Sequence, residues 1–197
     1  NGLNQAGLHL NLSYGTPVAP VAEVPSLVDE NGRFYRKVNK SIPLMNGVEI
    51  EKELRLQLEK FLAAGLKLTH IDSHHHAHAY PQVIDLAVRL ALEQGVPLRH
   101  TAEVKDKIIA AGVKTTDYFS MDFYNEKATL ENLQAIIGGY SDGVLEIMSH
   151  PGESEELLME ASSYNSARAK ELAVLTSPEI KAFLQAKGAK LISFAEL

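Results

Sequence analysis

Five of the eight histidines of this chain lie in a segment of ten residues, 69–78, which reads Thr-His-Ile-Asp-Ser-His-His-His-Ala-His. Imidazole is a common neutral metal ligand and titrates near physiological pH. Crowded rings are costly unless each buried nitrogen has a partner. An affinity tag or a solvated loop is the plainer explanation, but Ala77 interrupts the run, Asp72 belongs to it, and apolar segments flank it. The segment therefore predicts a metal or acid–base site.

The residues before this segment predict where the site lies in the fold. Residues 66–71 are apolar and β-branched and follow Gly65, a pattern typical of a short strand. The histidines therefore begin at the carboxyl end of a strand, where α/β folds build their active sites.

Two backbone conformations remain open for the histidines themselves. An extended chain would place Asp72, His74 and His76 on one face. A helical chain would instead stack His74 and His78, four residues apart. Either conformation allows Asp72 to orient an imidazole or to ligate a metal. We take His76 and Tyr80 as candidate substrate-binding residues of the same stretch.

Three further polar side chains belong to other predicted strands. In residues 6–13 leucines alternate with polar residues, so His9 is either an exposed strand position or part of a polar row that faces the site. Arg99 ends the strand 96–100 and suits either a surface salt bridge or the binding of a substrate or carboxylate. His150 follows the apolar strand 143–147 and precedes Pro-Gly, so it is either catalytic or a core histidine bonded to backbone.

Helical patterns separate these strands along the whole chain. The amphipathic spacing and cap residues predict helices over residues 49–64, 81–94, 104–111, 129–137, 165–174 and 177–186. Further strands are expected at 116–120 and 190–193. Such alternation predicts parallel strands covered by helices, in a barrel or an open doubly wound sheet. A barrel would bring His9, His74 and His150 to one mouth.

The irregular segment 16–46 is long for a connection within a compact domain, which is typical of a functional loop or lid. Its aromatic and basic residues Phe34, Tyr35 and Arg36 either contact a ligand or anchor the loop on the core.

Composition narrows the class of protein. The 197 residues suit one domain, and the net charge of −6 and pI near 5.8 argue against nucleic acid as a partner. There is no cysteine, so a metal must be held by histidine, carboxylate and water, which suits Zn, Mg, Mn, Ni or Co. No apolar run approaches ~20 residues, so no membrane helix is predicted.

Several motifs together resemble one known family, the YdjC-like, or ChbG-type, carbohydrate deacetylases. The histidine-rich segment is the most specific of them. The others match in order and approximate spacing over essentially the whole chain: residues 7–12 (Gly-Leu-His-Leu-Asn-Leu), 15–17 (Gly-Thr-Pro), Leu98-Arg99, 146–151 (Glu-Ile-Met-Ser-His-Pro), and Arg168 with 171–177.

The resemblance implies an α/β fold, a distorted (β/α) TIM-like barrel of the polysaccharide-deacetylase kind. It implies removal of N-acetyl groups from chito-oligosaccharides such as diacetylchitobiose. It also implies one divalent metal, Mg or Zn, held by an aspartate and two histidines, which match His9 and His74 here. The family's aspartate belongs to an Ala-Asp-Asp-Phe-Gly motif on the first strand, and this sequence contains no such motif. We therefore expect a single domain over residues 1–197 that lacks roughly the first fifty residues of a family member.

Within that resemblance each candidate residue has a role. His150 would protonate the leaving amine, Asp72 would orient a histidine, and Arg99 would bind the sugar or position a carboxylate. Two other functions remain open: a metal-dependent sugar-phosphate or phosphoester hydrolase, and a non-catalytic carbohydrate-binding module. A role in small-sugar catabolism would place the protein in the cytoplasm, with a small carbohydrate as its partner; a homo-oligomer is left open.

Overall fold

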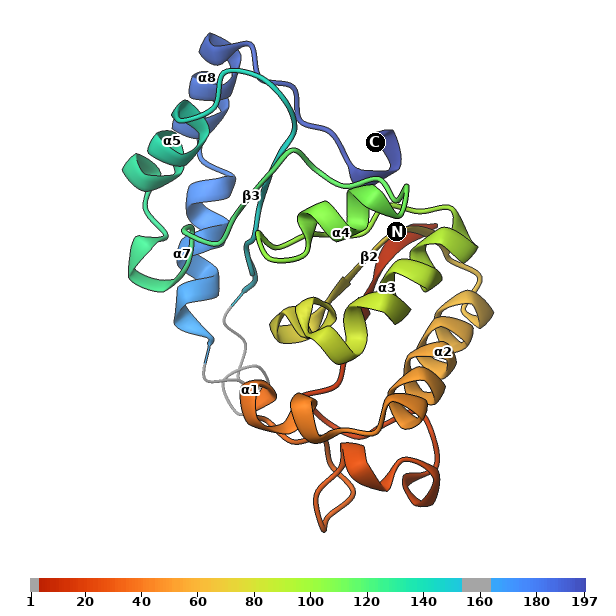
Figure 1. Cartoon of the computed structure of the whole chain (residues 1–197). Helices are drawn as coiled ribbons and strands as arrows, with labels where there is room; N and C mark the ends of the chain where they lie inside the picture. The colour runs from red at the N-terminus through yellow and green to blue at the C-terminus, as the bar shows by residue number, and fades with distance from the viewer. Residues whose placement is uncertain (1–3, 154–163) are drawn as a thin grey trace. The chain divides into compact units, whose positions relative to one another are not determined.

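The computed structural model describes residues 4–153 and 164–197, which form two compact units (Figure 1). The first unit comprises residues up to Thr115 together with Ser193–Leu197, and the second comprises Thr116–Ile192. Each unit is described by itself. The acidic stretch 155–158, expected to be solvated, lies outside the described residues.

The first unit is built on two parallel strands, β1 (Gln5–Leu10) and β2 (Lys67–Ser73). Their register pairs His9 with Asp72 at the carboxyl ends of both strands. The strand expected over 96–100 is reduced to a single parallel bridge, between Leu98 and Ile71. The register therefore places His9 of the first strand next to Asp72 of the histidine-rich segment.

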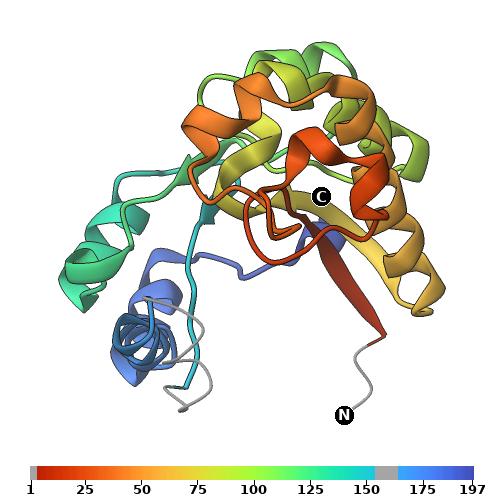
Figure 2. The same ribbon diagram turned by 90° about the horizontal axis from the view of Figure 1, so that it is seen from below.

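Helices α2 (Gly47–Ala63) and α3 (Pro81–Gln94) pack on this sheet and on each other, as Figures 1 and 2 show. Both were predicted from their apolar spacing, and α3 ends at Gly95, whose φ of 63° is the left-handed conformation that favours glycine. A shorter helix, α4 (Lys105–Ala110), follows. Their buried faces join the strand leucines in one core, which includes Leu10, Leu12, Ile50, Leu54, Ile71, Leu90, Leu98 and Ile108.

Segment 16–46 contains only short helices, namely 3-10 turns at Val21–Glu23, Pro25–Leu27 and Ile42–Leu44, and α1 (Val38–Ser41). Phe34 is buried and anchors the segment on the core, whereas Tyr35 and Arg36 remain exposed. The fully buried carboxylate of Glu53 on α2 accepts hydrogen bonds from the backbone N–H groups of Val18 and Ala19. The loop is therefore attached to α2 by a charged anchor that pattern analysis had not identified.

The second unit contains another parallel pair, β3 (Tyr118–Ser120) and β4 (Leu145–Ile147). A 3-10 turn at Asn125–Lys127 precedes α5 (Leu130–Gly138), and α7 (Ser166–Leu175) and α8 (Pro178–Lys187) follow. The buried core of this unit consists of Phe123, Ala128, Leu133 and Ile180. Strand β4 was expected to be buried, but its three residues are only half-buried.

The strand expected over 190–193 is wrong. These residues form no strand, and a 3-10 turn, Phe194–Glu196, follows them. The Ser193 hydroxyl and the Glu196 carboxylate form a capping box, and the Phe194 ring stacks on His70 at 4.0 Å between centroids. The turn Phe194–Glu196 thus lies beside β2, whereas Leu191 and Ile192 stay exposed.

The described residues establish a mixed α/β fold with two short parallel sheets. The finer expectation of a TIM-like barrel stays a prediction. Nowhere in residues 4–153 and 164–197 is a helix both long and apolar enough to cross a membrane.

Candidate functional site

A buried carboxylate, Asp72, joins His9 and Arg99 at the carboxyl end of the first sheet. The Nδ1 atom of His9 lies 2.8 Å from one carboxylate oxygen, and Nη1 of Arg99 lies 2.7 Å from the other. Burial acts to raise the pKa of Asp72, but the hydrogen bond and charge of His9, with the charge of Arg99, outweigh it, so the pKa falls below its usual value. Asp72 is therefore ionised and holds the His9 ring through its Nδ1 atom.

A second group is centred on the Ser13 hydroxyl, which is completely buried. Its oxygen lies 2.8 Å from Nδ1 of His74 and 3.1 Å from Nδ1 of His75. The His74 and His75 rings lie 3.8 Å apart between centroids, and the His9 ring approaches His74 edge-on at 5.9 Å. Three histidines from two strand ends are thus gathered in one place.

The histidine segment adopts neither of the two conformations left open by its sequence. Residues His74–Ala79 form a 3-10 segment in which His75 and His76 have φ near 52° and 51°, the left-handed region. Non-glycine residues adopt this region at an energetic cost, and such strain is concentrated at functional sites. The sequence contained no glycine here to indicate the turn.

His78 holds the end of this turn. The Ser73 hydroxyl oxygen accepts a hydrogen bond from the backbone N–H of His78 at 3.0 Å and lies 2.6 Å from its Nδ1. Burial, assisted by the charge of His76, lowers the pKa of His78 to about 4. His78 is therefore neutral at pH 7 and has a structural position.

The two residues predicted to bind substrate, His76 and Tyr80, lie on the same segment and are half-buried. The His76 ring meets that of His78 edge-on at 6.2 Å. Tyr80 is the N-cap residue of α3 and packs against the core. Their role in binding stays a prediction.

His70, the first histidine of the segment, is held by packing. Its ring lies between Phe194 and Gly7, where a Cβ atom would come within 2.2 Å of its Cε1 atom. Burial lowers its pKa. The chain therefore needs glycine at position 7 because an imidazole occupies the space that a side chain would fill.

Tyr14 is a site neighbour that the sequence did not reveal. Its ring meets His74 edge-on at 6.1 Å, and the Arg36 guanidinium lies 5.2 Å from its centroid. The Asn11 side chain fixes this turn, since its carbonyl accepts from the N–H groups of Ser13 and Tyr14 and its amide donates to the Tyr14 carbonyl. The only available signal was a short amide residue directly after a strand, which favours such a turn.

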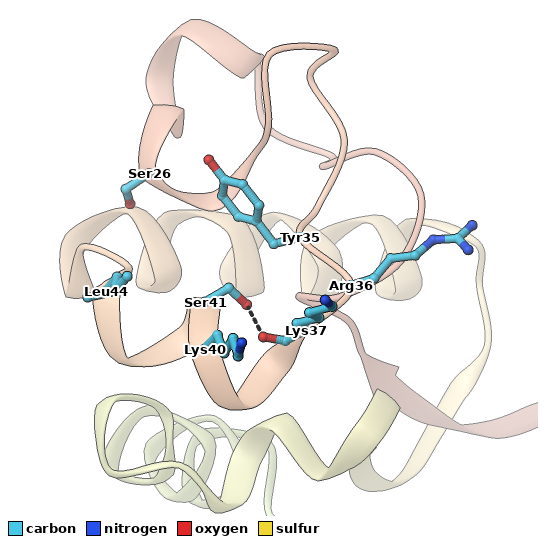
Figure 3. Close-up of a pocket in the computed structure, with 7 residues that line it drawn as sticks. All are labelled: Ser26, Tyr35, Arg36, Lys37, Lys40, Ser41 and Leu44. Carbon is cyan, nitrogen blue, oxygen red and sulfur yellow. Dashed lines mark hydrogen bonds between the residues drawn. The ribbon is translucent and has the colours of Figure 1, made fainter.

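Arg36 also lines a pocket of about 670 Å³ (Figure 3). The other lining residues are Ser26, Tyr35, Lys37, Lys40, Ser41 and Leu44. Within the described part of the chain none of the three cations forms an ion pair with a carboxylate. In Figure 3 the Arg36 guanidinium extends away from the other lining side chains, so Lys37 and Lys40 are the cations closest to the pocket.

His150 belongs to the second unit and has its own surroundings there. Its ring meets the stacked rings of Tyr124 and Tyr164 edge-on, at 5.7 and 5.6 Å. The buried Glu171 carboxylate accepts hydrogen bonds from the His150 backbone N–H and the Tyr164 hydroxyl. Burial, followed by this hydrogen bond, raises the pKa of Tyr164 to about 12.

Arg168 completes the arrangement in the second unit. Its guanidinium donates to the backbone carbonyls of His150 and Tyr164. Glu171 and Arg168 thus hold the His150 backbone, while aromatic rings flank its side chain, and its catalytic role stays a prediction. Sequence analysis had singled out Arg168 and Glu171 only as matching positions and had not linked them to His150.

The donor atoms of the first unit fit a divalent cation in part. His9 and His74 each have Nδ1 engaged by an oxygen atom, which leaves Nε2 as the possible ligand atom, and an imidazole held by a carboxylate is a frequent arrangement around metals. Among residues 4–153 and 164–197, however, no group of three or more histidine or acidic side chains is arranged to hold an ion. These residues therefore account for two ligands.

Comparison with known protein families gives a match to this chain. The family model described as YdjC-like protein matches residues 1–186. The chain belongs to the YdjC-like family. It is 42% identical to a carbohydrate deacetylase of Brevibacillus brevis, over 97% of this chain and 77% of the relative, and 36% identical to one of Thermoanaerobacter pseudethanolicus, with the same coverage.

A solved structure of related sequence has the same fold. It comes from Enterococcus faecalis and is described as a "putative cellobiose-phosphate cleavage protein". The two chains superpose with a TM-score of 0.90 at 30% identity, over 98% of this chain and 77% of the other. The family predicted from the histidine-rich motif is thus confirmed, as is its prediction of an enzyme, since the relatives named above are deacetylases.

Proposed function

We propose that this YdjC-like protein is a metal-dependent hydrolase that removes N-acetyl groups from small amino-sugar oligosaccharides of the chitobiose type. Family membership supports hydrolytic deacetylation of a carbohydrate. The observation that carries the proposal further is the pair of imidazoles at the ends of β1 and β2, one oriented by Asp72 and the other by Ser13.

The proposed cofactor is one divalent cation, with Mg first and Zn as the alternative. His9 and His74 would bind it through Nε2, and the resemblance assigns a third ligand to an aspartate. Such an ion supplies Lewis-acid polarisation of the amide carbonyl and a lower pKa for bound water.

The remaining roles belong to the side chains of this protein. Asp72 orients the His9 ring, and the ion pair with Arg99 favours the ionised form of Asp72. His76 and Tyr80 are proposed to contact the sugar. His150, which Tyr124 and Tyr164 flank, is proposed to protonate the leaving amine. The proposed location, from the catabolic role, is the cytoplasm.

A phosphoester hydrolase is a second candidate because of one specific observation. Lys37 and Lys40 line the pocket of Figure 3 and form no ion pair with a carboxylate of the described chain, and cations of this kind bind phosphate. The name of the Enterococcus faecalis neighbour also refers to a sugar phosphate.

The test measures acetate and phosphate release in parallel from diacetylchitobiose and from a phosphorylated disaccharide. It uses this chain, and the chain preceded by the motif-bearing first strand of a family member, each with and without Mg²⁺ or Zn²⁺. Acetate release that requires the metal supports the proposal, and phosphate release without acetate supports the second candidate. Tight sugar binding without turnover in every form would indicate a binding module instead.

The variant His74→Ala separates the metal site from the fold. We expect it to abolish metal-dependent deacetylation while its circular dichroism stays that of the parent, because one of two imidazole ligands is removed. Retained activity with normal metal content would contradict the assignment of His74.

A further inference from the structure

The Ser13 hydroxyl imposes a constraint on two histidines at once. It has a single proton, yet Nδ1 of His74 and Nδ1 of His75 both lie within hydrogen-bond distance, at 2.8 and 3.1 Å. Both contacts can be hydrogen bonds only if at least one of the two rings donates an Nδ1–H to the serine oxygen. The protonation patterns of the two imidazoles are therefore coupled through one atom.

Three arrangements satisfy this constraint. In the first, Nδ1–H of His74 donates to the Ser13 oxygen and the Ser13 hydroxyl donates to Nδ1 of His75. In the second, the two histidines exchange these roles. In the third, both rings donate an Nδ1–H to the Ser13 oxygen. In the third case the hydroxyl proton needs another acceptor, and Ser13 is completely buried and has no other side-chain partner among the described residues. An unsatisfied buried hydroxyl costs about 1–3 kcal/mol, which disfavours that case. The two rings therefore take opposite tautomers.

The proposed binding of a metal by Nε2 of His74 then selects between the two remaining arrangements. His74 can offer a lone pair at Nε2 only if its proton is on Nδ1, so it must donate to Ser13. The hydroxyl proton is then directed at Nδ1 of His75, which leaves the proton of His75 on Nε2. His75 is exposed, its ring lies 3.8 Å from that of His74, and its backbone is strained at φ 52°.

We propose that Ser13 is a positioning residue that fixes the ligand tautomer of His74 and makes Nε2–H of His75 a hydrogen-bond donor to the carbonyl oxygen of the substrate amide. This inference rests on the proposed deacetylation for the role of His75, whereas the coupling of the tautomers stands on geometry alone. A donor aimed at the oxygen on which charge develops is worth about 10²–10³ in kcat.

The first measurement is of the tautomers, by two-bond ¹H–¹⁵N correlation spectra of the labelled protein near pH 8. The variants His74→Gln and His75→Gln assign the two rings. We expect opposite tautomers in the metal-free protein, and Nδ1–H at His74 with Nε2–H at His75 once Zn²⁺ is bound. The same tautomer on both rings would overturn the coupling.

The second measurement is the Zn²⁺ affinity by calorimetry. Ser13→Ala should weaken binding by about 10-fold or more, because an outer hydrogen bond to a ligand is lost. The matched control Ser13→Thr keeps the hydroxyl and should stay within about 3-fold of the parent. Equal affinities in the parent and Ser13→Ala would overturn the positioning role of Ser13.

The third measurement separates His75 from the metal. His75→Gln should lower kcat for acetate release by about 10²-fold, with KM and Zn²⁺ affinity nearly unchanged. An unchanged kcat would overturn the donor role of His75. If neither this chain nor the chain preceded by the motif-bearing first strand releases acetate, the proposed function fails, while the spectra still decide the coupling between His74 and His75.

Discussion

At the scale of single residues, the stability of the first unit depends on the side chains that pair with the buried Asp72 carboxylate. Arg99→Ala would leave this carboxylate without its arginine partner and with the His9 ring as its remaining side-chain contact. We expect the free energy of unfolding at pH 7 to fall by about 2–4 kcal/mol, because a largely buried charge loses a partner 2.7 Å away. Urea denaturation measures the change.

The control for this prediction is Arg99→Lys, which keeps the positive charge but not the planar fork. It should lose less stability than Arg99→Ala. If both variants unfolded at the same urea concentration as the parent, Arg99 would be a surface cation with no bearing on Asp72.

His78 makes stability depend on pH in a direction that its surroundings fix. Its pKa is about 4 in the folded chain and about 6.5 when unfolded, so below pH 6.5 the unfolded state binds the proton first. The neutral, buried His78 thus contributes stability that is fully present above pH 6.5. As the pH falls from 6.5 toward 4, the free energy of unfolding decreases by up to about 3 kcal/mol.

The variant His78→Gln isolates this contribution. It should flatten the fall in unfolding free energy between pH 6.5 and 4, as measured by urea titrations at several pH values, although it is less stable at pH 7.5 because the Ser73 contacts change. Curves for parent and variant that run parallel over this range would show that His78 does not titrate as described.

The residues that could be identified from sequence alone are those whose spacing is local. Asp72, His74 and His76 lie within one motif, and His9 alternates with leucines. Ser13 was only one member of the polar row of residues 6–13, and Tyr14 was missed. Their importance arises only when β1 and β2 pair and bring Ser13 to His74, 61 residues later in the chain. A serine after a strand has no distinctive pattern of its own.

At the scale of elements, the close approach of β1 and β2 depends on Gly7. Gly7→Ala would place a Cβ atom 2.2 Å from His70 Cε1, so the ring must shift from its place between Gly7 and Phe194. We expect a loss of about 1–3 kcal/mol in unfolding free energy, measured by urea denaturation.

A double-mutant cycle identifies the cause. In a His70→Ala background the space is open, and Gly7→Ala should cost well under half of what it costs in the parent. An equal cost in both backgrounds would mean that backbone conformation, and not the imidazole, requires glycine at position 7.

Helices were predicted more accurately than strands for a physical reason. Helix α3 begins at Pro81 and ends before Gly95, so both of its limits are encoded locally. A strand instead needs a partner whose position the local sequence does not give. Residues 190–193 resemble a strand in composition, yet the Ser193–Glu196 capping box and the stacking of Phe194 on His70 produce a turn.

At the scale of the whole molecule, the length of the chain and the family resemblance indicated a single domain, and this stays a prediction. The described residues form two compact units, each with a buried core of its own. The chain enters the second unit after Thr115 and returns to the first at Ser193. The family match spans both units, so their separate cores serve one protein.

Separate cores predict separate stabilities, which amide hydrogen exchange can resolve. Phe123→Leu in the second unit and Ile50→Val in the first each remove part of a fully buried side chain, at a cost of about 1 kcal/mol. We expect Phe123→Leu to reduce protection in α5 and α8 more than in α2 and α3, and Ile50→Val to do the reverse. If either variant lowered protection equally throughout the chain, the two units would unfold as one cooperative domain. The single domain expected from the sequence would then describe the unfolding of the molecule better than its two separate cores do.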